Sequence, residues 1–360
     1  MPLLEVCLVD NSPIKGYLGA VLKKPDVIVW LRTSNQRKVV SQIESAISGQ
    51  LSTSFESREI IKDGIDEFVQ QCELIIKDYL EHDILLDVSG GLQLYALLAT
   101  EVFKNADKEV TFIDTNHSRI INIKTGEYKT FHFTMTVNEY IALQGVQMDS
   151  GTRFDPEIGK RNTLSYFIGN NMERVIPFID KIREEWIDMG DNKKNIQWRM
   201  DDPYHRFTII YESSDNKMRF RFGVTDRQKT LEITKDGPEY LFSGGWLREL
   251  ACLRVHRSQY DDVRLNVRLN RDTFPEGIRA ESMIDISMMK GCNFYIFQCF
   301  SYPVTRESFI ELKAVQTTVQ LLNAKGFIFM AHRPHRGFIE RVHDGGLEVV
   351  YGRRLCNFSL

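Results

Sequence analysis

Several signatures of familiar protein classes are missing from this chain of 360 residues. It has no apolar run of the roughly 18–20 residues that cross a bilayer, and no basic stretch precedes an apolar one near its start, as in a secretory signal. Its six cysteines include no CxxC pair and no Cys/His spacing typical of zinc. We therefore expect a cytoplasmic protein with free thiols, no membrane segment and no structural zinc site.

Motifs of the commonest enzyme classes are missing as well. No GxGxxG follows the first expected strand, which argues against a dinucleotide-dependent dehydrogenase. There is no HExxH, the signature of zinc proteases, and no GxSxG, the signature of α/β-hydrolases. Low-complexity tracts and internal repeats are also lacking, while 42% of the residues are hydrophobic. That composition is typical of a globular protein with a proper core.

The N-terminal part alternates apolar strands with amphipathic helices. Strands separated by helices of this length predict a parallel sheet covered on both faces, so we expect a Rossmann-like domain. A change to period two over 119–134 predicts an appended hairpin. The expected strands are 3–9, 27–31, 84–88 and 110–114, and the expected helices are 14–22, 37–47, 60–79 and 92–104.

The rest of the chain has two further parts. The pattern predicts helices and a pair of strands in the middle, then a compact α/β core at the end. The fold class is therefore α/β, with domains at 1–135, 136–238 and 239–360. The expected elements are helices at 137–144 and 166–189, strands at 207–211 and 218–222, a helix at 247–257, strands at 263–269, 282–288 and 294–299, a helix at 309–322 and a strand at 327–330.

Small polar residues follow three of the expected parallel strands, at 10–12, 33–35 and 89–91. Ligands of open parallel sheets bind at the carboxyl ends of the strands. Gly90 and Gly91 lead directly into a helix, where free backbone N–H groups favour a phosphate. Alternatively, the two glycines serve only a tight strand–helix turn.

The same stretches resemble one known family. They are LVDNSPIKGYLGAVLKKPDVIVWL at 8–31, DVSGGLQLYALLATEVF at 87–103 and FIDTNHS at 112–118. They resemble CARF domains, the cyclic-oligoadenylate sensors of type III CRISPR antiviral defence. The diglycine region is similar to that family's (S/T)GGTK element, which lies at a two-fold dimer interface. The resemblance implies a homodimer that binds a cyclic oligoadenylate, expected to be cyclic tetra-adenylate.

The resemblance also assigns ligand-binding candidates by position. Leu92 and Gln93 stand where the family's element has Thr and Lys, so a hydroxyl and a cation are missing at the phosphate-binding turn. The candidates are Asp10, Asn11, Ser12, Ser34, Ser89, Gly90, Gly91, Gln93 and Asn116.

A second resemblance covers the C-terminal part. It rests on SGGWLREL at 243–250, MIDISMMKGCNFYIFQCFS at 283–301 and ELKAVQTTVQLL at 311–322, and extends to VNEYIALQG at 137–145 and the ending GFIERVHDGGLEVVYGRRL. These stretches resemble the restriction-endonuclease-like PD-(D/E)xK domain that is fused to CARF domains in cyclic-oligoadenylate-activated nucleases. The resemblance implies metal-dependent cleavage of single-stranded DNA or RNA.

In such nucleases an Asp on one strand and a Glu on the next hold Mg²⁺ or Mn²⁺, and a Lys two residues later stabilises developing charge. Asp285 matches the Asp, and Glu249 matches a carboxylate on the preceding helix. Gln298 and Phe300 stand at the Glu and Lys positions, and Lys313 corresponds to a helix lysine. The resemblance thus implies Asp285, Gln298, Glu249 and Lys313 as catalytic candidates and Asp285 and Gln298 as metal ligands. Because the site lacks one formal negative charge, we expect Mn²⁺ to be preferred over Mg²⁺.

Three functions remain open at this point. The first is a cyclic-oligoadenylate sensor with a weakened nuclease. The second is a sensor or binding protein that keeps only the nuclease fold, because a site with so few charges is a poor one for Mg²⁺. The third is a regulator whose middle segment binds duplex DNA, although its helices lack a basic recognition face.

Overall fold

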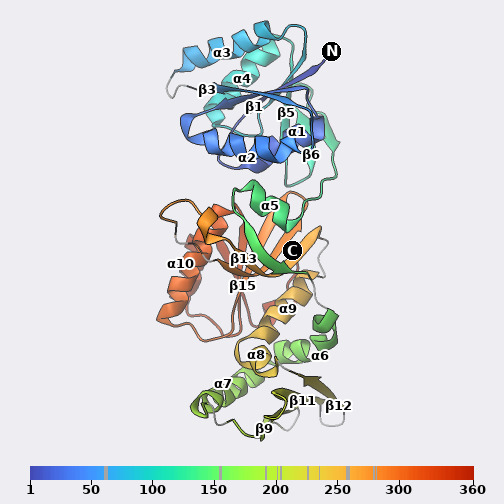
Figure 1. Cartoon of the computed structure of the whole chain (residues 1–360), viewed down its shortest axis with the longest axis vertical. Coiled ribbons are helices and arrows are strands. Elements are labelled where there is room, and N and C mark those ends of the chain that lie inside the picture. The colour runs from blue at the N-terminus through green and yellow to red at the C-terminus, as the bar shows by residue number, and fades with distance from the viewer. Residues whose placement is uncertain are drawn as a thin grey trace. The chain divides into compact units, whose positions relative to one another are not determined.

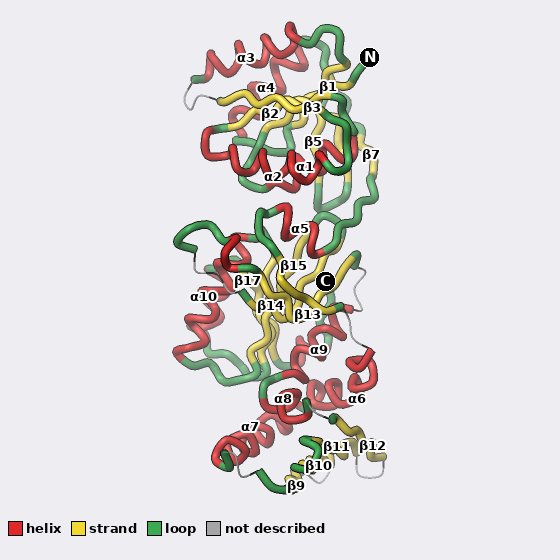
Figure 2. The backbone as a smooth tube through the Cα atoms, viewed as in Figure 1, coloured by secondary structure: helices red, strands yellow, loops and turns green. Residues whose placement is uncertain are grey.

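The computed structural model describes residues 1–60, 64–153, 156–190, 193–200, 202, 205–224, 227–234, 236–256, 260–278, 280 and 282–360. The chain divides into two compact units. Unit 1 comprises Met1–Met148 and Met289–Phe294, and unit 2 comprises Asp149–Met288 and Tyr295–Leu360. Figures 1 and 2 show the helices and the three sheets of these units. The boundaries expected at 135 and 238 stay predictions.

Unit 1 is built on a seven-stranded sheet. The five strands β1 to β5 pair in parallel with their neighbours. The strands β6 and β7 are added antiparallel at one side, as the sequence pattern predicts. In order across the sheet they are β3 (Ser54–Glu59), β2 (Val27–Arg32), β1 (Leu3–Leu8), β4 (Asp83–Asp87), β5 (Glu109–Asp114), β6 (Arg119–Asn122) and β7 (Tyr128–Thr130). The Rossmann-like architecture is confirmed.

Helices cover both faces of this sheet. Two of them, α1 and α2, pack side by side on one face, while α3 and α4 pack side by side on the other (Figure 1). Between the latter pair and the sheet lies a core that includes Phe68, Tyr95 and Phe103, all buried. The helices are α1 (Pro13–Lys23), α2 (Arg37–Ser48), α3 (Ile65–Asp78), α4 (Gln93–Asn105) and α5 (Val137–Leu143). The helix expected over 60–79 thus begins at Ile65, and residues 61–63 lie outside the described residues.

Strand β3 is an edge strand that the sequence pattern does not predict. Its sequence, SFESRE, is polar, because an edge strand half covered by solvent needs no apolar run. Ion pairs and hydrogen bonds hold it instead: Arg58 contacts Glu56 at 2.6 Å and Asp78 at 2.9 Å, and Tyr79 donates to Glu56 at 2.6 Å. Polar pairing therefore replaces hydrophobic patterning at this edge.

Unit 2 contains two sheets. The expected strand pair is confirmed as β10 (His205–Glu212) and β11 (Lys217–Val224), antiparallel from Glu212↔Lys217 to His205↔Val224. Unpredicted strands β9 (Ile196–Met200) and β12 (Arg227–Ile233) flank them in the order β12-β11-β10-β9. Phe207 and Phe220 are fully buried beneath this small sheet.

The second sheet, which belongs mostly to unit 2, has six strands, and the residues of it that belong to unit 1 are Met148 and those within Met289–Phe294. Their order is β17 (Leu347–Tyr351), β16 (Lys325–Met330), β15 (Asn293–Phe300), β14 (Met283–Lys290), β13 (Asp262–Leu269) and β8 (Met148–Thr152). The sequence pattern predicts β13 to β16, but neither β8 nor β17. The edge strand β8 precedes β13 by more than a hundred residues, so this sheet draws on two distant parts of the chain.

Seven helices are described in unit 2: α6 (Pro156–Asn170), α7 (Met172–Asp188), α8 (Gly237–Phe242), α9 (Gly245–His256), α10 (Arg306–Leu321), α11 (Arg336–Asp344) and α12 (Arg353–Cys356). The helix expected over 166–189 corresponds to two helices, α6 and α7, because the helical conformation is interrupted at Asn171. The helix expected over 247–257 is α9, and residue 257 lies outside the described residues. In the part of the chain that is described, no helix is both long enough and apolar enough to cross a membrane.

Candidate functional site

The carboxyl ends of β1, β2, β3 and β4 surround a hollow of about 600 Å³ in unit 1. It lies beside the point between β1 and β4 where the strand order of the sheet reverses. Ligand sites of this architecture are found at such a point. Four of the candidates from the sequence line it together, Asp10, Asn11, Ser34 and Gly91. The full lining is Asp10, Asn11, Thr33, Ser34, Asn35, Gln36, Glu59, Ile60, Gly91 and Leu92.

The two glycines at this hollow are fixed by close packing against β1. A Cβ on Gly90 would collide with the carbonyl oxygen of Leu8. Gly91 has φ +80°, and a Cβ there would lie 2.8 Å from the Cβ of Leu8. Both positions therefore require glycine for structural reasons, and the turn that they form brings backbone N–H groups to the start of α4.

Beneath this turn lies a buried charged cluster. Lys23 Nζ contacts Asp87 Oδ2 at 2.7 Å, Glu5 Oε1 at 2.8 Å and Thr111 Oγ1 at 2.9 Å. Burial alone would lower the pKa of Lys23, but the carboxylates of Asp87 and Glu5 raise it overall. Burial also raises the pKa of Glu5. We call Lys23, Glu5, Asp87 and Thr111 the lysine cluster.

The lysine cluster is linked to the turn through Asp87 and Ser89. The Ser89 N–H donates to Asp87 Oδ1 at 2.8 Å, and Ser89 Oγ accepts from the Ile113 N–H at 2.7 Å. Ser89 is 4% exposed, so its hydroxyl supports the turn from below. This candidate therefore has a structural place beside the hollow and does not line it.

Gln36 is a lining residue that sequence reasoning missed. It is 7% exposed, its Nε2 donates to the carbonyl of Val9 at 2.8 Å, and its Oε1 accepts from the Thr33 N–H at 2.8 Å. The side chain thereby ties the ends of β1 and β2 together. No sequence pattern marks this residue, because the burial that makes its amide require partners is visible only in the structure.

Ion pairs surround the hollow. Asp10 lies 3.3 Å from Lys15, and Glu59 contacts Arg32 at 3.1 Å and Arg37 at 2.8 Å. Two acidic side chains of the lining thus hold three cations close by. Since an incoming phosphate can take over a cation from a carboxylate, these pairs could supply positive charge to an anionic ligand.

The remaining N-terminal candidates do not line the hollow. The Ser12 N–H donates to Asp10 Oδ1 at 2.7 Å, which places this residue at the start of α1. Gln93 is exposed at the first position of α4. Asn116 is exposed after β5, and its N–H donates to Asp114 Oδ1 at 3.1 Å.

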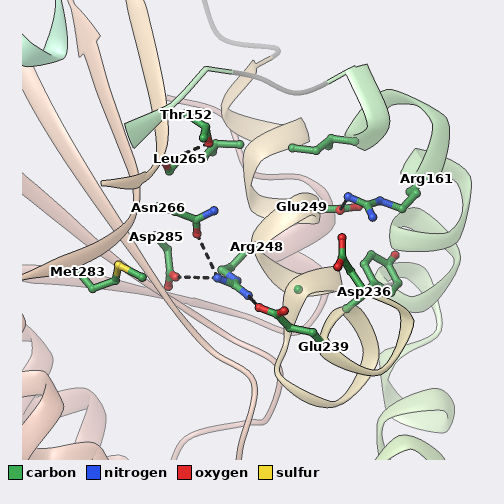
Figure 3. Close-up of a pocket in the computed structure, with 13 residues that line it drawn as sticks. Thr152, Arg161, Asp236, Glu239, Arg248, Glu249, Leu265, Asn266, Met283 and Asp285 are labelled. Carbon is green, nitrogen blue, oxygen red and sulfur yellow. Dashed lines mark hydrogen bonds and ion pairs between the residues drawn. The ribbon is translucent and has the colours of Figure 1, made fainter. Parts of the chain in front are cut away.

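A second cavity of about 410 Å³ lies in unit 2 (Figure 3). Two catalytic candidates, Asp285 on β14 and Glu249 on α9, line it together. Its full lining is Thr152, Ile158, Arg161, Asp236, Glu239, Tyr240, Gly245, Arg248, Glu249, Leu265, Asn266, Met283 and Asp285.

Asp285 faces an arginine in this cavity. Its Oδ2 accepts from the Cys299 N–H at 2.8 Å, and its Oδ1 lies 3.9 Å from Arg248 Nη1. The same Nη1 donates to Asn266 Oδ1 at 3.1 Å, and Nη2 lies 3.9 Å from Glu239 Oε1. Figure 3 shows the Arg248 side chain reaching between these three groups.

Glu249 is held separately. Its Oε1 contacts Arg161 Nη2 at 2.6 Å, and its Oε2 accepts from Ser165 Oγ at 3.4 Å. The Ser165 hydroxyl also bonds the Tyr240 hydroxyl at 2.9 Å, and burial raises the pKa of Tyr240 far above its usual range. Glu249 is 7% exposed, so an arginine neutralises this carboxylate inside the fold.

The other C-terminal candidates are placed apart from the cavity lining. Gln298 Oε1 accepts from the Asp285 N–H at 3.4 Å. Phe300 is buried and packs against Phe338 with ring centroids 6.2 Å apart. Lys313 is exposed on α10. The structure therefore brings Asp285 and Gln298 into contact, and does not bring Lys313 to the cavity.

These residues do not fit a resident divalent metal. Among the described residues, no three Asp, Glu, His or Cys side chains are grouped so that they could hold one ion. Asp285 and Glu249 each face a guanidinium. Burial raises the pKa of Cys299 well above its usual value, and the Asp285 carboxylate raises it further, so this thiol stays protonated. Hard cations need several anionic oxygens free of such competition.

Similarity to known proteins is confined to structure. No protein-family model matches the sequence, and no curated protein matches it. Protein VC1899 from Vibrio cholerae has a similar structure, with a TM-score of 0.74 and 14% identity over 99% of this chain and 95% of that one. Can2 from Sulfobacillus thermosulfidooxidans, solved in complex with cyclic tetra-adenylate, gives a TM-score of 0.69 and 13% identity over 96% and 95%.

A third solved structure is similar over less of its own length. It is a type III CRISPR defence DNA nuclease activated by cyclic oligoadenylate, with a TM-score of 0.51 and 12% identity over 92% of this chain and 45% of that one. At such identities the likeness concerns the fold. It confirms the expected fold class, an α/β chain with a Rossmann-like parallel sheet in unit 1 and further sheets elsewhere in the chain.

Proposed function

We propose that a chain with the fold of these structures uses unit 1 to sense a cyclic oligoadenylate in type III CRISPR antiviral defence. The observation that carries the proposal is the hollow at the carboxyl edge of the seven-stranded sheet, where Asp10, Asn11, Ser34 and Gly91 converge. The ligand bound to Can2 is cyclic tetra-adenylate. We infer the same ligand class for this hollow.

The chemistry of the hollow suits such a ligand. Backbone N–H groups at the diglycine turn and the start of α4 favour phosphate oxygens. Asn11 and Asn35 carry amides of the kind that pair with the edge of adenine. Lys15 and Arg37 are paired with Asp10 and Glu59, two residues that line the hollow. They could offset the charge that Leu92 and Gln93 do not supply.

We further propose that the sensor is a homodimer. The apolar side chains of Leu92, Leu94 and Leu97 are 55%, 50% and 70% exposed. Leu92 lines the hollow, and the other two lie one turn apart on α4. An apolar face continuous with a ligand site suits a second copy of the chain, because a cyclic ligand with internal symmetry can contact both copies alike.

Ser34→Asp tests the binding site. It adds a negative charge to the lining at an exposed position, and repulsion of phosphate should weaken binding of cyclic tetra-adenylate at least about tenfold in calorimetry. Gly91 is less suitable, because its φ and its packing on Leu8 would also strain the fold. Ser52→Asp is the matched control, because this exposed serine precedes β3 and lies at the amino ends of the strands, away from the hollow. Equal affinity in the two variants would reject the hollow as the site.

For unit 2 there are two candidate functions. The first is metal-dependent cleavage of single-stranded DNA or RNA, with a weak site that prefers Mn²⁺. The second is binding without cleavage, with only the nuclease fold retained. The arginines that face Asp285 and Glu249 favour the second, because each neutralises a carboxylate that a nuclease would offer to its metal.

A cleavage assay separates the two functions. We expect no cleavage of single-stranded DNA or RNA with Mg²⁺ or Mn²⁺, with or without cyclic tetra-adenylate. Cleavage by the unaltered protein that is lost in Asp285→Ala would instead establish the weakened nuclease. Binding of cyclic tetra-adenylate is measured in the same samples, so an inactive but ligand-bound protein is recognised as such.

A further inference from the structure

The guanidinium of Arg248 occupies an oxygen-lined position in the cavity of unit 2 (Figure 3). Its neighbours are Asn266 Oδ1 at 3.1 Å, Asp285 Oδ1 at 3.9 Å and Glu239 Oε1 at 3.9 Å. These oxygens belong to three different elements, β13, β14 and α8. Carboxylate and amide oxygens converging from several elements are what hard divalent cations select. Here an arginine stands among them.

Arginine differs from a metal ion in one decisive respect. Its charge is covalently attached to α9 and is not lost at any physiological pH, because a guanidinium does not deprotonate in proteins. Asp285 is only 12% exposed at its side chain. A second cation at this carboxylate would therefore be repelled by the guanidinium through a partly dry region, where screening is weak.

We infer that Arg248 is the permanent cation of this cavity and excludes divalent metal ions from Asp285. The inference goes beyond ligand sensing in unit 1 and is independent of it. It assigns to one residue the repulsion of a metal ion from Asp285, and it predicts that the oxygens of Asp285, Asn266 and Glu239 gain measurable affinity for such an ion once that residue is removed.

The test is a titration with Mn²⁺ alone, followed by the electron paramagnetic resonance signal of the free ion. The unaltered protein should show no saturable site below the millimolar range. Arg248→Ala should gain a single site with affinity raised at least about tenfold. Arg264→Ala is the matched control, because this arginine also pairs with an aspartate, Asp262 at 3.0 Å, but does not line the cavity. It should behave like the unaltered protein.

Further variants locate the acquired ion. Adding Asp285→Asn to Arg248→Ala should abolish the gain, whereas Arg248→Lys should show none because the charge is kept. Circular dichroism establishes that each variant is folded, and Arg248→Gln, which is neutral but polar, replaces the alanine variant if that one does not fold. Equal Mn²⁺ affinity of the unaltered protein and a folded neutral variant would overturn the inference. So would a gain that survives Asp285→Asn.

Discussion

Lys23 balances the charge of the two buried carboxylates in the lysine cluster. Glu5 is fully buried and Asp87 is 3% exposed, and Lys23 is within 2.8 Å of both carboxylates. Two carboxylates buried with one cation are stable only while that cation is present. The pKa of Glu5 is raised, chiefly by burial, while Lys23 acts in the opposite direction.

Lys23→Met should therefore destabilise the fold by about 3–5 kcal/mol near neutral pH. The loss should shrink as the pH falls from about 8 to about 5, since a carboxyl group whose pKa is raised in the folded state adds stability as it becomes protonated. Urea denaturation at both pH values measures the effect.

Lys77→Met, at an exposed lysine of α3, is the control for this change and should have little effect at either pH. If Lys23→Met costs no more than the control, or if its cost grows with acidity, the lysine cluster does not stabilise the fold as described.

Arg248 and Glu249 show where sequence reasoning about single residues ends. They are neighbours on α9, so they point in directions about 100° apart. Position in a motif matched Glu249 to the carboxylate of the site, but the structure places Arg248 beside Asp285 and binds Glu249 to Arg161. Hydrophobic patterning does not determine the rotation of α9 about its own axis closely enough to tell which of these two neighbouring side chains faces Asp285.

Among the elements, those with strong hydrophobic periodicity were predictable and the polar ones were not. The parallel strands β1, β2, β4 and β5 are buried apolar runs. Four of the polar or glycine candidates predicted after β1, β2 and β4 line the hollow, whereas the contribution of β3 was not predicted. By contrast, β8 (MDSGT) has no apolar pattern, because its place in the sheet comes from a distant partner strand.

The turn between β4 and α4 allows a test at this scale. Gly90→Ala should destabilise the protein by about 1–3 kcal/mol, because the added methyl group collides with the backbone of Leu8. Thermal denaturation measures the change. Gly49→Ala, at the end of α2 with φ −80° and open space around it, should cost nothing or stabilise slightly. Similar melting temperatures for the two variants would contradict the close packing at Gly90.

At the scale of the whole molecule, dimerisation is the main prediction. Leu97→Glu places a charge on the most exposed apolar position of α4 and should convert the dimer to a monomer. Light scattering after size-exclusion chromatography gives the mass directly. Leu74→Glu, at a 51% exposed leucine on α3, should remain dimeric. An unaltered protein with the mass of a single chain would refute the dimer itself.

Strand β8 has a consequence for modularity. It completes the edge of the six-stranded sheet beside β13, and Thr152 Oγ1 donates to the carbonyl of Leu265 across that edge. A cassette excised at residue 239, the start expected from the sequence for the C-terminal domain, and grafted onto another N-terminal domain would leave this strand behind. Its β13 would then present bare N–H and C=O groups, the usual template for aggregation. Exchange of the C-terminal part between proteins of this fold, by recombination or by design, therefore has to cut the gene ahead of residue 148.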